Sequence, residues 1–137
     1  MSDPAENVAF VERAYGIWRD EGIDGLRSLM HDDVEWHPPP QAPEPGPFRG
    51  LEEILRVLRS YMESFGEFMP VPDRVLAGAE PDQVVVLATL TTRGRESGAE
   101  LSIPVGHLLT LRDGKVLSFQ VFTEQEAALR AAGLKPG

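Results

Sequence analysis

Acid–base groups are scarce where a catalytic site would need them, because the predicted long strands at 83–92 and 99–111 carry no aspartate and Glu100 lies near a turn. There is no cysteine, which excludes disulfides, thiolate nucleophiles and cysteine-ligated metals. The three histidines, His31, His37 and His107, lack the close spacing of metal-binding motifs, so we expect no metal site and no cofactor. Because an unperturbed histidine titrates near about pH 6.5, these residues are the natural acid–base candidates.

His107 is the strongest of the three candidates. It lies in an apolar run that predicts a buried strand, and Gly106 beside it would let a substrate approach the backbone closely. A hydrogen-bonded core histidine is the alternative role for this residue. We interpret His31 as a solvated turn residue. His37 follows Trp36 on a predicted strand and so points to the opposite face, where a structural or interface role is expected.

Aromatic residues from several predicted elements form a second group of candidates. Large rings mostly fill the cores of small domains, yet an aromatic, largely apolar cavity is also the usual form of a small-ligand site. We predict that a small hydrophobic ligand contacts Trp18, Trp36, Phe48, Tyr61, Phe65 and Phe122. Thr89, Thr91 and Arg93 alternate along one strand and would add hydroxyls and a cation, unless that face meets solvent or a second copy.

Composition excludes several classes of partner. The net charge of −9 argues against nucleic acid and anionic membranes, because both require a basic surface. No apolar run approaches the roughly 18 residues of a membrane span, and the first residues lack the pattern of a signal peptide. We therefore expect a cytoplasmic protein made of one domain over residues 1–137.

Periodicity places these residues on alternating elements. Asp3 caps a predicted helix that begins at Pro4, a short helix covers 23–30, and a third helix follows Gly50. Residues 31–33 read as a polar turn before a strand over 34–37. Six prolines between positions 38 and 47 predict a rigid loop that covers the domain, or alternatively a PxxP-type ligand.

The second half of the sequence is typical of a strand meander. Strands are predicted over 68–76, 83–92, 99–111 and 116–122, joined by turns at 94–98 and at Asp113–Gly114. Thr123 and Glu126 form a predicted capping box for a short helix that ends at Gly133. Helices segregated against one mainly antiparallel sheet give an α+β fold, in which three helices close over a strongly curved sheet to leave a cone with an open mouth.

Several segments together resemble the SnoaL-like proteins of the nuclear-transport-factor-2-like superfamily, in a bacterial branch. They are GIDGL at 22–26, MHDDVEWHP at 30–38, FRG at 48–50, LRDGKV at 111–116 and EAALRAAGL at 126–134. The resemblance covers nearly the whole chain. It implies the cone-shaped fold and a homodimer through the outer sheet face, and the near-continuous apolar character of 84–90 and 105–111 agrees with such an interface.

The resemblance also permits a check against ketosteroid isomerases, which share the fold. Their catalytic base and two oxyanion donors would fall at Pro38, Ala14 and Gly106, none of which titrates. Gln120 stands where related sequences often carry glutamate, and its amide can orient a ligand without acting as a base. If the protein is an enzyme, elimination leaves His107 as the acid–base group.

Three functions therefore remain open. The first is an isomerase, cyclase or hydrolase-type enzyme acting on a small hydrophobic compound. The second is a non-catalytic protein that binds such a compound. The third is a dimeric interaction module that uses the sheet face and the proline-rich loop.

Overall fold

The computed structural model describes residues 3–39, 46–65, 67–93 and 98–135, the side chains of 64–69 excepted. Its helices are α1 (Pro4–Glu21), α2 (Ile23–Leu26), α3 (Leu51–Phe65) and α4 (Gln125–Ala131). Its strands are β1 (Met30–His37), β2 (Phe48–Arg49), β3 (Glu67–Ala77), β4 (Gln83–Arg93), β5 (Glu100–Arg112) and β6 (Lys115–Phe122). The predicted order of elements is confirmed, with the short edge strand β2 as an addition.

Local signals set both the start and the end of α1. The carboxylate of Asp3 accepts hydrogen bonds from the backbone N–H groups of Ala5 and Glu6, at 2.9 and 3.5 Å. It therefore satisfies donors that have no partner inside the helix. Gly22 ends the helix with φ of 69°, a conformation that favours glycine.

The six strands form a single sheet in the order β2-β1-β6-β5-β4-β3. Strands β3 to β6 are the predicted antiparallel meander, and β1 adds to it in parallel with β6. Between β5 and β6, Asp113 and Gly114 both have positive φ, 54° and 73°, as the predicted type I′ turn requires. The predicted turn at 94–98 lies largely outside the described residues.

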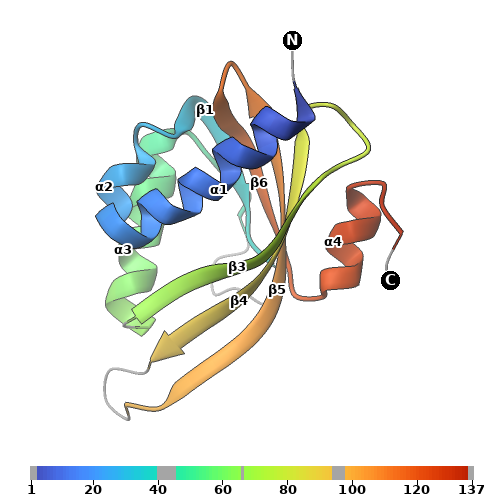
Figure 1. Ribbon diagram of the computed structural model, residues 1–137. Coiled ribbons are helices and arrows are strands. Elements are labelled where there is room, and N and C mark those ends of the chain that lie inside the picture. The colour runs from blue at the N-terminus through green and yellow to red at the C-terminus, as the bar shows by residue number, and fades with distance from the viewer. Residues whose placement is uncertain (1–2, 40–45, 66, 94–97, 136–137) are drawn as a thin grey trace.

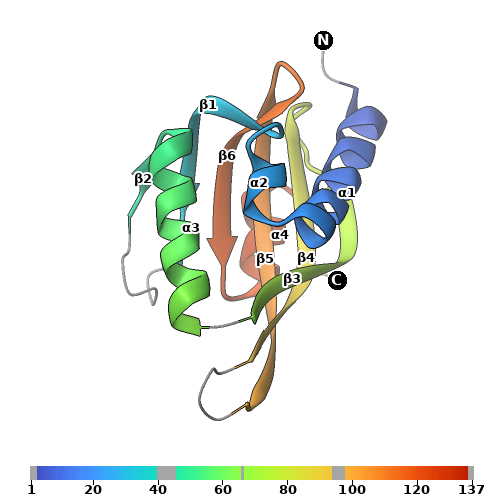
Figure 2. The same cartoon turned by 90° about the vertical axis from the view of Figure 1, so that its left-hand side faces the viewer.

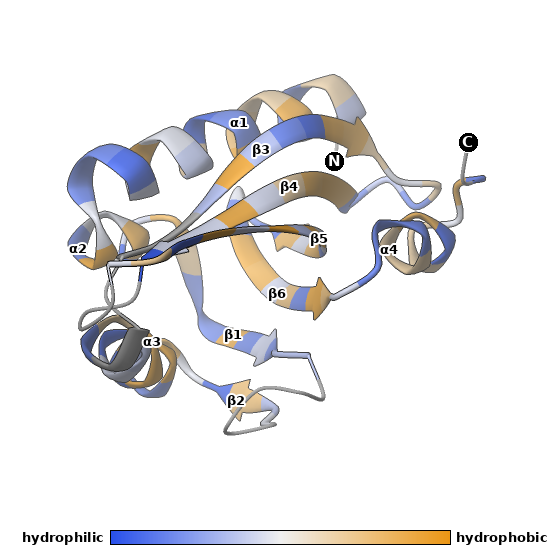
Figure 3. Ribbon diagram, turned by 90° about the horizontal axis from the view of Figure 1, so that it is seen from below, coloured by the Kyte–Doolittle hydropathy of each residue, from blue (hydrophilic) through white to orange (hydrophobic). Residues whose placement is uncertain are grey.

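The curled, unclosed sheet separates the helices into two groups (Figures 1 and 3). Helices α1, α2 and α3 lie on the inner side, where α1 packs on β3 and β4, and α3 packs on β1. Helix α4 lies on the other side, against β5. Figure 2 looks onto the inner side, with α3 and α1 flanking the strands. This arrangement is the predicted α+β cone. Within the described ranges, no helix is both long and apolar enough to cross a membrane.

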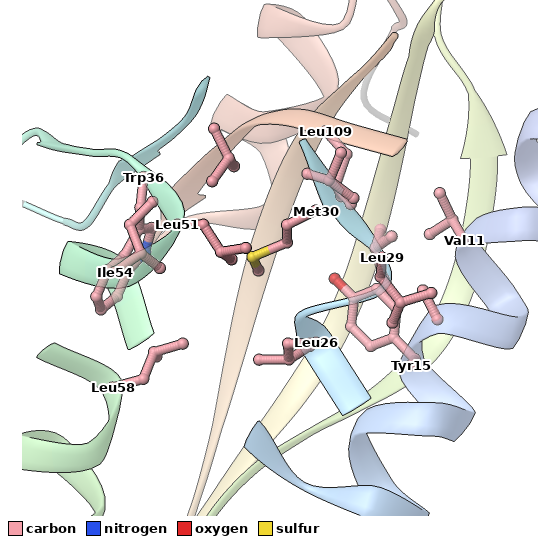
Figure 4. Close-up of a cluster of buried hydrophobic side chains, with 14 of the residues drawn as sticks. Val11, Tyr15, Leu26, Leu29, Met30, Trp36, Leu51, Ile54, Leu58 and Leu109 are labelled. Carbon is pink, nitrogen blue, oxygen red and sulfur yellow. The ribbon is translucent and has the colours of Figure 1, made fainter. Parts of the chain in front are cut away.

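The main core fills the inner side of the sheet. Leu51, Ile54 and Leu58 project from α3 toward Trp36, while Val11 and Tyr15 project from α1 (Figure 4). The fully buried residues of β4 point alternately to the two faces of the sheet. Val84 and Val86 join this main core, whereas Val85 packs against α4 on the outer side. The continuous apolar run of β4 therefore follows from burial on both faces.

The segment 31–33 is a strand and not the predicted polar turn. Strand β1 already begins at Met30, which is paired with Val116 of β6. The register between β1 and β6 shifts before Glu35, so the polar residues occupy an irregular part of the ladder. The pairing of Met30 and of Glu35 with β6, on either side of His31-Asp32-Asp33, keeps this segment extended despite its low strand preference.

Helix α4 sits on the outer face because Gly106 leaves room for it. A Cβ atom added at Gly106 would overlap the Cβ of Ala128. The helix starts one residue later than its predicted cap, with Glu124 as N-cap and no side-chain cap hydrogen bond. The side chain of Gln125 instead donates to the backbone oxygens of Ala88 and Val105, at 3.3 Å each. A tertiary contact to the sheet thus anchors this end of the helix.

We expect Gly106→Ala to lower the free energy of unfolding by about 1–3 kcal/mol, because the added methyl group overpacks the contact with Ala128. Ala128→Gly removes the opposing methyl group, at roughly 1 kcal/mol for a glycine in a helix. The double variant should therefore be more stable than the two single losses added together. Urea denaturation of the unmodified protein, the two single variants and the double variant gives the double-mutant cycle. Strictly additive losses of stability would contradict this packing.

Candidate functional site

A cavity of about 370 Å³ opens between α3, the end of α1 and the inner face of the sheet. This volume is within the range of small-molecule sites, roughly 300–1,000 Å³. The residues that line it are mostly aliphatic or aromatic. They are Trp18, Met30, Val34, Trp36, Pro39, Ile54, Leu58, Tyr61, Pro70, Leu90, Ile103, Val105, His107, Phe119, Val121 and Thr123.

Trp36 forms one wall of the cavity. It is buried, and its ring lies 5.5 Å from Tyr61 of α3 in an edge-on arrangement and 5.5 Å from Phe48 of β2. The edge-on arrangement with Tyr61 is one that aromatic pairs prefer. The two ring contacts position the indole ring in this wall of the cavity.

His107 lines the cavity and is held by Tyr15 of α1. The Tyr15 hydroxyl is 2.6 Å from Nδ1 of the imidazole, and both side chains are buried. Burial lowers the pKa of His107 to about 3 and raises the pKa of Tyr15 above its ordinary value. At neutral pH the pair is therefore a neutral phenol hydrogen-bonded to a neutral imidazole.

This geometry changes the chemistry expected of His107. A group whose pKa is about 3 is a weak general base at neutral pH and cannot serve as a general acid there. The imidazole still has a second nitrogen, Nε2, for which we find no hydrogen-bond partner among the described residues. His107 is thus suited to hydrogen-bond a ligand rather than to exchange protons with it.

Trp18 lines the cavity with its indole ring. Its Nε1–H is buried and has no acceptor among the residues that the structure describes. An indole N–H is a donor only, and a buried donor without an acceptor costs about 1–3 kcal/mol. The nitrogen has essentially no accessible surface, so the indole ring lines the cavity while its N–H is closed off from it.

Charged groups are absent from the described lining of the cavity. The ion pairs lie on the surface instead, as between Arg27 and Glu52, or between Arg56 and Glu53 at 2.6 Å along α3. The described part of the chain also contains no cluster of histidine and carboxylate side chains able to hold a metal ion. The site as described offers dispersion contacts and neutral hydrogen bonds.

The structure brings four of the predicted site residues to this cavity: Trp18, Trp36, Tyr61 and His107. Phe48 lies behind Trp36 and supports it. The side chain of Phe65 lies outside the described set. Pro39 lines the cavity, but the predicted covering role of the proline-rich loop rests mainly on residues 40–45, which are also outside the described residues.

The remaining predicted ligand contacts lie on the outer face of the sheet. Leu90 lines the cavity, so its neighbours Thr89 and Thr91 point the other way, as does Arg93. Thr89 donates to Asp73, and Arg93 pairs with Glu100 at 2.9 Å. Gln120 and Phe122 lie on either side of Val121, which lines the cavity, so their side chains also point to the outer face. Gln120 is exposed, and Phe122 packs under α4.

Tyr15 and the strand residues Phe119 and Val121 belong to the site but were not predicted from the sequence. The alternation of Phe119 and Val121 with polar Gln120 was a usable signal for the inner face of β6. No local signal pairs Tyr15 with His107, 92 positions away. The positions assigned by resemblance, Ala14 and Gly106, are each one residue before the side chains that actually meet.

Comparison with known proteins identifies related folds. A model of the SnoaL-like domain matches residues 11–119. An NTF2-like protein of unknown function from Burkholderia pseudomallei superposes with a TM-score of 0.74 at 19% identity, over 90% of this chain and 95% of that one. No curated protein gives a significant match.

Two structures with higher identity have names that mention a function or a ligand. A proposed SnoaL-like polyketide cyclase from Jannaschia sp. CCS1 is 26% identical, with a TM-score of 0.72, over 97% of this chain and 95% of that one. TerC, co-crystallised with polyporic acid, is 25% identical, with a TM-score of 0.74, over 93% of this chain and 98% of that one.

Proposed function

The chain belongs to the SnoaL-like domain family, and we propose on that premise that it binds an uncharged, largely apolar small molecule in the cavity between α3 and the curved sheet. The observation that carries this proposal is the lining. It is apolar apart from a few neutral polar groups. A charged ligand would lose its hydration there without gaining a counter-charge from any described lining residue.

Relatives support a small-molecule role. TerC was crystallised with polyporic acid, and the Jannaschia protein is named for a polyketide cyclase activity. An enzyme is accordingly a second candidate, and His107 is the observation that favours it, since a neutral imidazole N–H can polarise a carbonyl group. Such an enzyme would need a base that the described lining lacks. Binding without turnover is therefore the function that the site supports better.

The homodimer predicted from the sequence stays a prediction. The apolar residues of the outer face that suggested it include Val85, Leu87 and Leu108, and these pack against α4 within the same chain. A second copy would have to meet the part of β3, β4 and β5 beyond α4, where Val71, Thr89 and Pro104 lie across from one another.

Matched fluorescent probes test the binding proposal. N-phenylnaphthylamine is apolar and uncharged, and its sulfonated analogue adds one negative charge to the same ring system. We expect the uncharged probe to bind with one-to-one stoichiometry and at least about tenfold more tightly, a difference of ~1.4 kcal/mol. Equal affinity, or tighter binding of the sulfonate, would contradict an uncharged site.

Two neighbouring tryptophan substitutions locate the bound probe. Val121→Trp places a large ring into the cavity, whereas Gln120→Trp places the same ring on the outer face of the same strand. The first variant should lose binding of N-phenylnaphthylamine by about tenfold or more, and the second should bind like the unmodified protein. Circular dichroism establishes that both are folded. If Val121→Trp bound the probe as tightly as the unmodified protein, the probe would not occupy this cavity.

A further inference from the structure

A second, smaller void lies next to the cavity, under α1 and α2. Its volume is about 30 Å³, which is roughly the share of one molecule in liquid water. An ordered water needs two to four polar partners, and no polar atom of the described lining faces this void. The space therefore suits an apolar group. The residues that line the void and not the cavity are Ala14, Tyr15, Leu26, Leu29, Leu109 and Val116.

Four side chains separate the void from the cavity, because Trp18, Met30, Pro70 and Phe119 line both spaces. Three of the four are rings with few rotatable bonds. Met30 is unbranched and has three rotatable bonds, so it adapts most easily. In Figure 4 its side chain lies between the residues that project from α3 and those that lie under α1. A change of the Met30 rotamer is therefore the simplest way to join the two spaces.

An apolar group that enters the void gains contacts that the empty protein lacks. Side chains around a void have no partner atoms on one side, so they forgo part of their dispersion attraction. A methyl or methylene group placed there regains these contacts and also leaves water. Each methylene group that is fully buried on binding strengthens it by about fourfold. A polar group would instead lose its hydration without gaining a hydrogen bond.

We propose that the ligand carries a small alkyl branch of one or two carbon atoms, which enters this void when Met30 turns aside while the body of the ligand fills the cavity. This inference rests on the proposed function and adds the shape of the ligand to it. It selects ring compounds with a short alkyl substituent over unsubstituted rings and over rings with a hydroxyl or charged substituent at that point.

Matched ligands test the branch by displacement of N-phenylnaphthylamine. Naphthalene, 1-ethylnaphthalene and 2-ethylnaphthalene share one ring system, and the two isomers expose nearly the same apolar surface. We expect one isomer to bind about tenfold more tightly than naphthalene and the other to gain less, because the void lies at one fixed place in the wall. Equal gains by the two isomers, or no gain, with the probe itself bound, would overturn the inference and leave the proposed function standing. Absence of probe binding would instead refute the proposed function.

Filling the void shows where the ethyl group binds. Ala14→Val adds two methyl groups at the void, whereas Ala9→Val makes the same change at an exposed position of the same helix. Naphthalene should bind both variants as it binds the unmodified protein, because neither residue lines the cavity. The favoured isomer should lose its advantage in Ala14→Val and keep it in Ala9→Val. An advantage that persists in Ala14→Val would place the ethyl group outside the void and overturn the inference.

Val116→Ile is a second filling variant, which adds a single methyl group from β6. It should also remove the advantage of the favoured isomer. Its urea midpoint should be at or above that of the unmodified protein, because the added group enters empty space. An extra methyl group in a well-packed core is destabilising. A clearly lower midpoint would therefore mean that the space beside Val116 is already filled, and it would overturn the inference without any ligand.

Discussion

Replacing Trp36 with alanine should lower the free energy of unfolding by about 3–5 kcal/mol, the loss typical of removing a large aromatic side chain from a core. Only 6% of Trp36 is exposed, and its ring contacts Phe48 and Tyr61 at centroid distances of 5.5 Å. Its removal would enlarge the existing cavity and leave both neighbouring rings without their partner. The same change should weaken binding of N-phenylnaphthylamine, because Trp36 is a wall of the site.

His31→Ala is the control, since it alters the same strand on a residue outside the core. The imidazole of His31 is partly exposed and accepts a local hydrogen bond from the backbone N–H of Asp33 at 3.1 Å. We expect a loss within about 1 kcal/mol, as for most surface substitutions. Urea denaturation measures both variants. Equal midpoints for Trp36→Ala and His31→Ala would contradict the placement of Trp36 in the core.

Acidification should destabilise the protein through His107. The pKa of this residue is about 3 in the folded protein and 6.5 in the unfolded chain, so between these values the unfolded state binds a proton that the folded state excludes. Stability therefore decreases as pH falls from about 6.5, by at most ~1.4 kcal/mol per pH unit. Between pH 6.5 and 5 this amounts to roughly 2 kcal/mol.

His107→Gln isolates this contribution because glutamine does not titrate and its amide oxygen can accept from Tyr15. The loss of stability between pH 7 and 5 should be about 2 kcal/mol smaller in His107→Gln than in the unmodified protein, whatever the variant's stability at pH 7. Glu52 and Glu53, whose pKa values Arg27 and Arg56 hold below the usual range, would contribute at lower pH. The comparison of stabilities is therefore limited to the range from pH 7 to pH 5.

Denaturation at each pH provides the measurement. An identical pH dependence in His107→Gln and the unmodified protein would mean that His107 is not buried as a neutral ring.

Local patterns predicted the elements well because their causes are local. Asp3 caps α1 by contacts within three residues, and Asp113–Gly114 forms its turn through its own backbone preferences. The long strands follow from β-branched runs, and none of their boundaries differs from the predicted one by more than one residue. The segment 31–33 differs from its predicted structure because the residues on either side of it, Met30 and Glu35, pair with β6, which is far along the chain.

The candidate site was less predictable because it depends on which face of the sheet each side chain points to. A shift of one residue exchanges the two faces of a strand, so Gly106 and His107 have opposite surroundings although they are neighbours. The resemblance placed a donor at Gly106, which instead lies under Ala128, and the imidazole of His107 takes the inner position. The apolar runs of β4 and β5 suggested a dimer because the sequence does not show that α4 covers their outer residues.

The only two tryptophans in the chain, Trp18 and Trp36, both line the cavity. Intrinsic fluorescence of this protein is therefore a signal from the inner side of the sheet alone. Detachment of α4 from the outer face would leave that emission nearly unchanged, whereas far-ultraviolet circular dichroism would register the lost helix. Melting curves from the two methods would then separate, a result usually taken as evidence for a folding intermediate. In this molecule the separation would mean that the two sides of one sheet unfold at different temperatures.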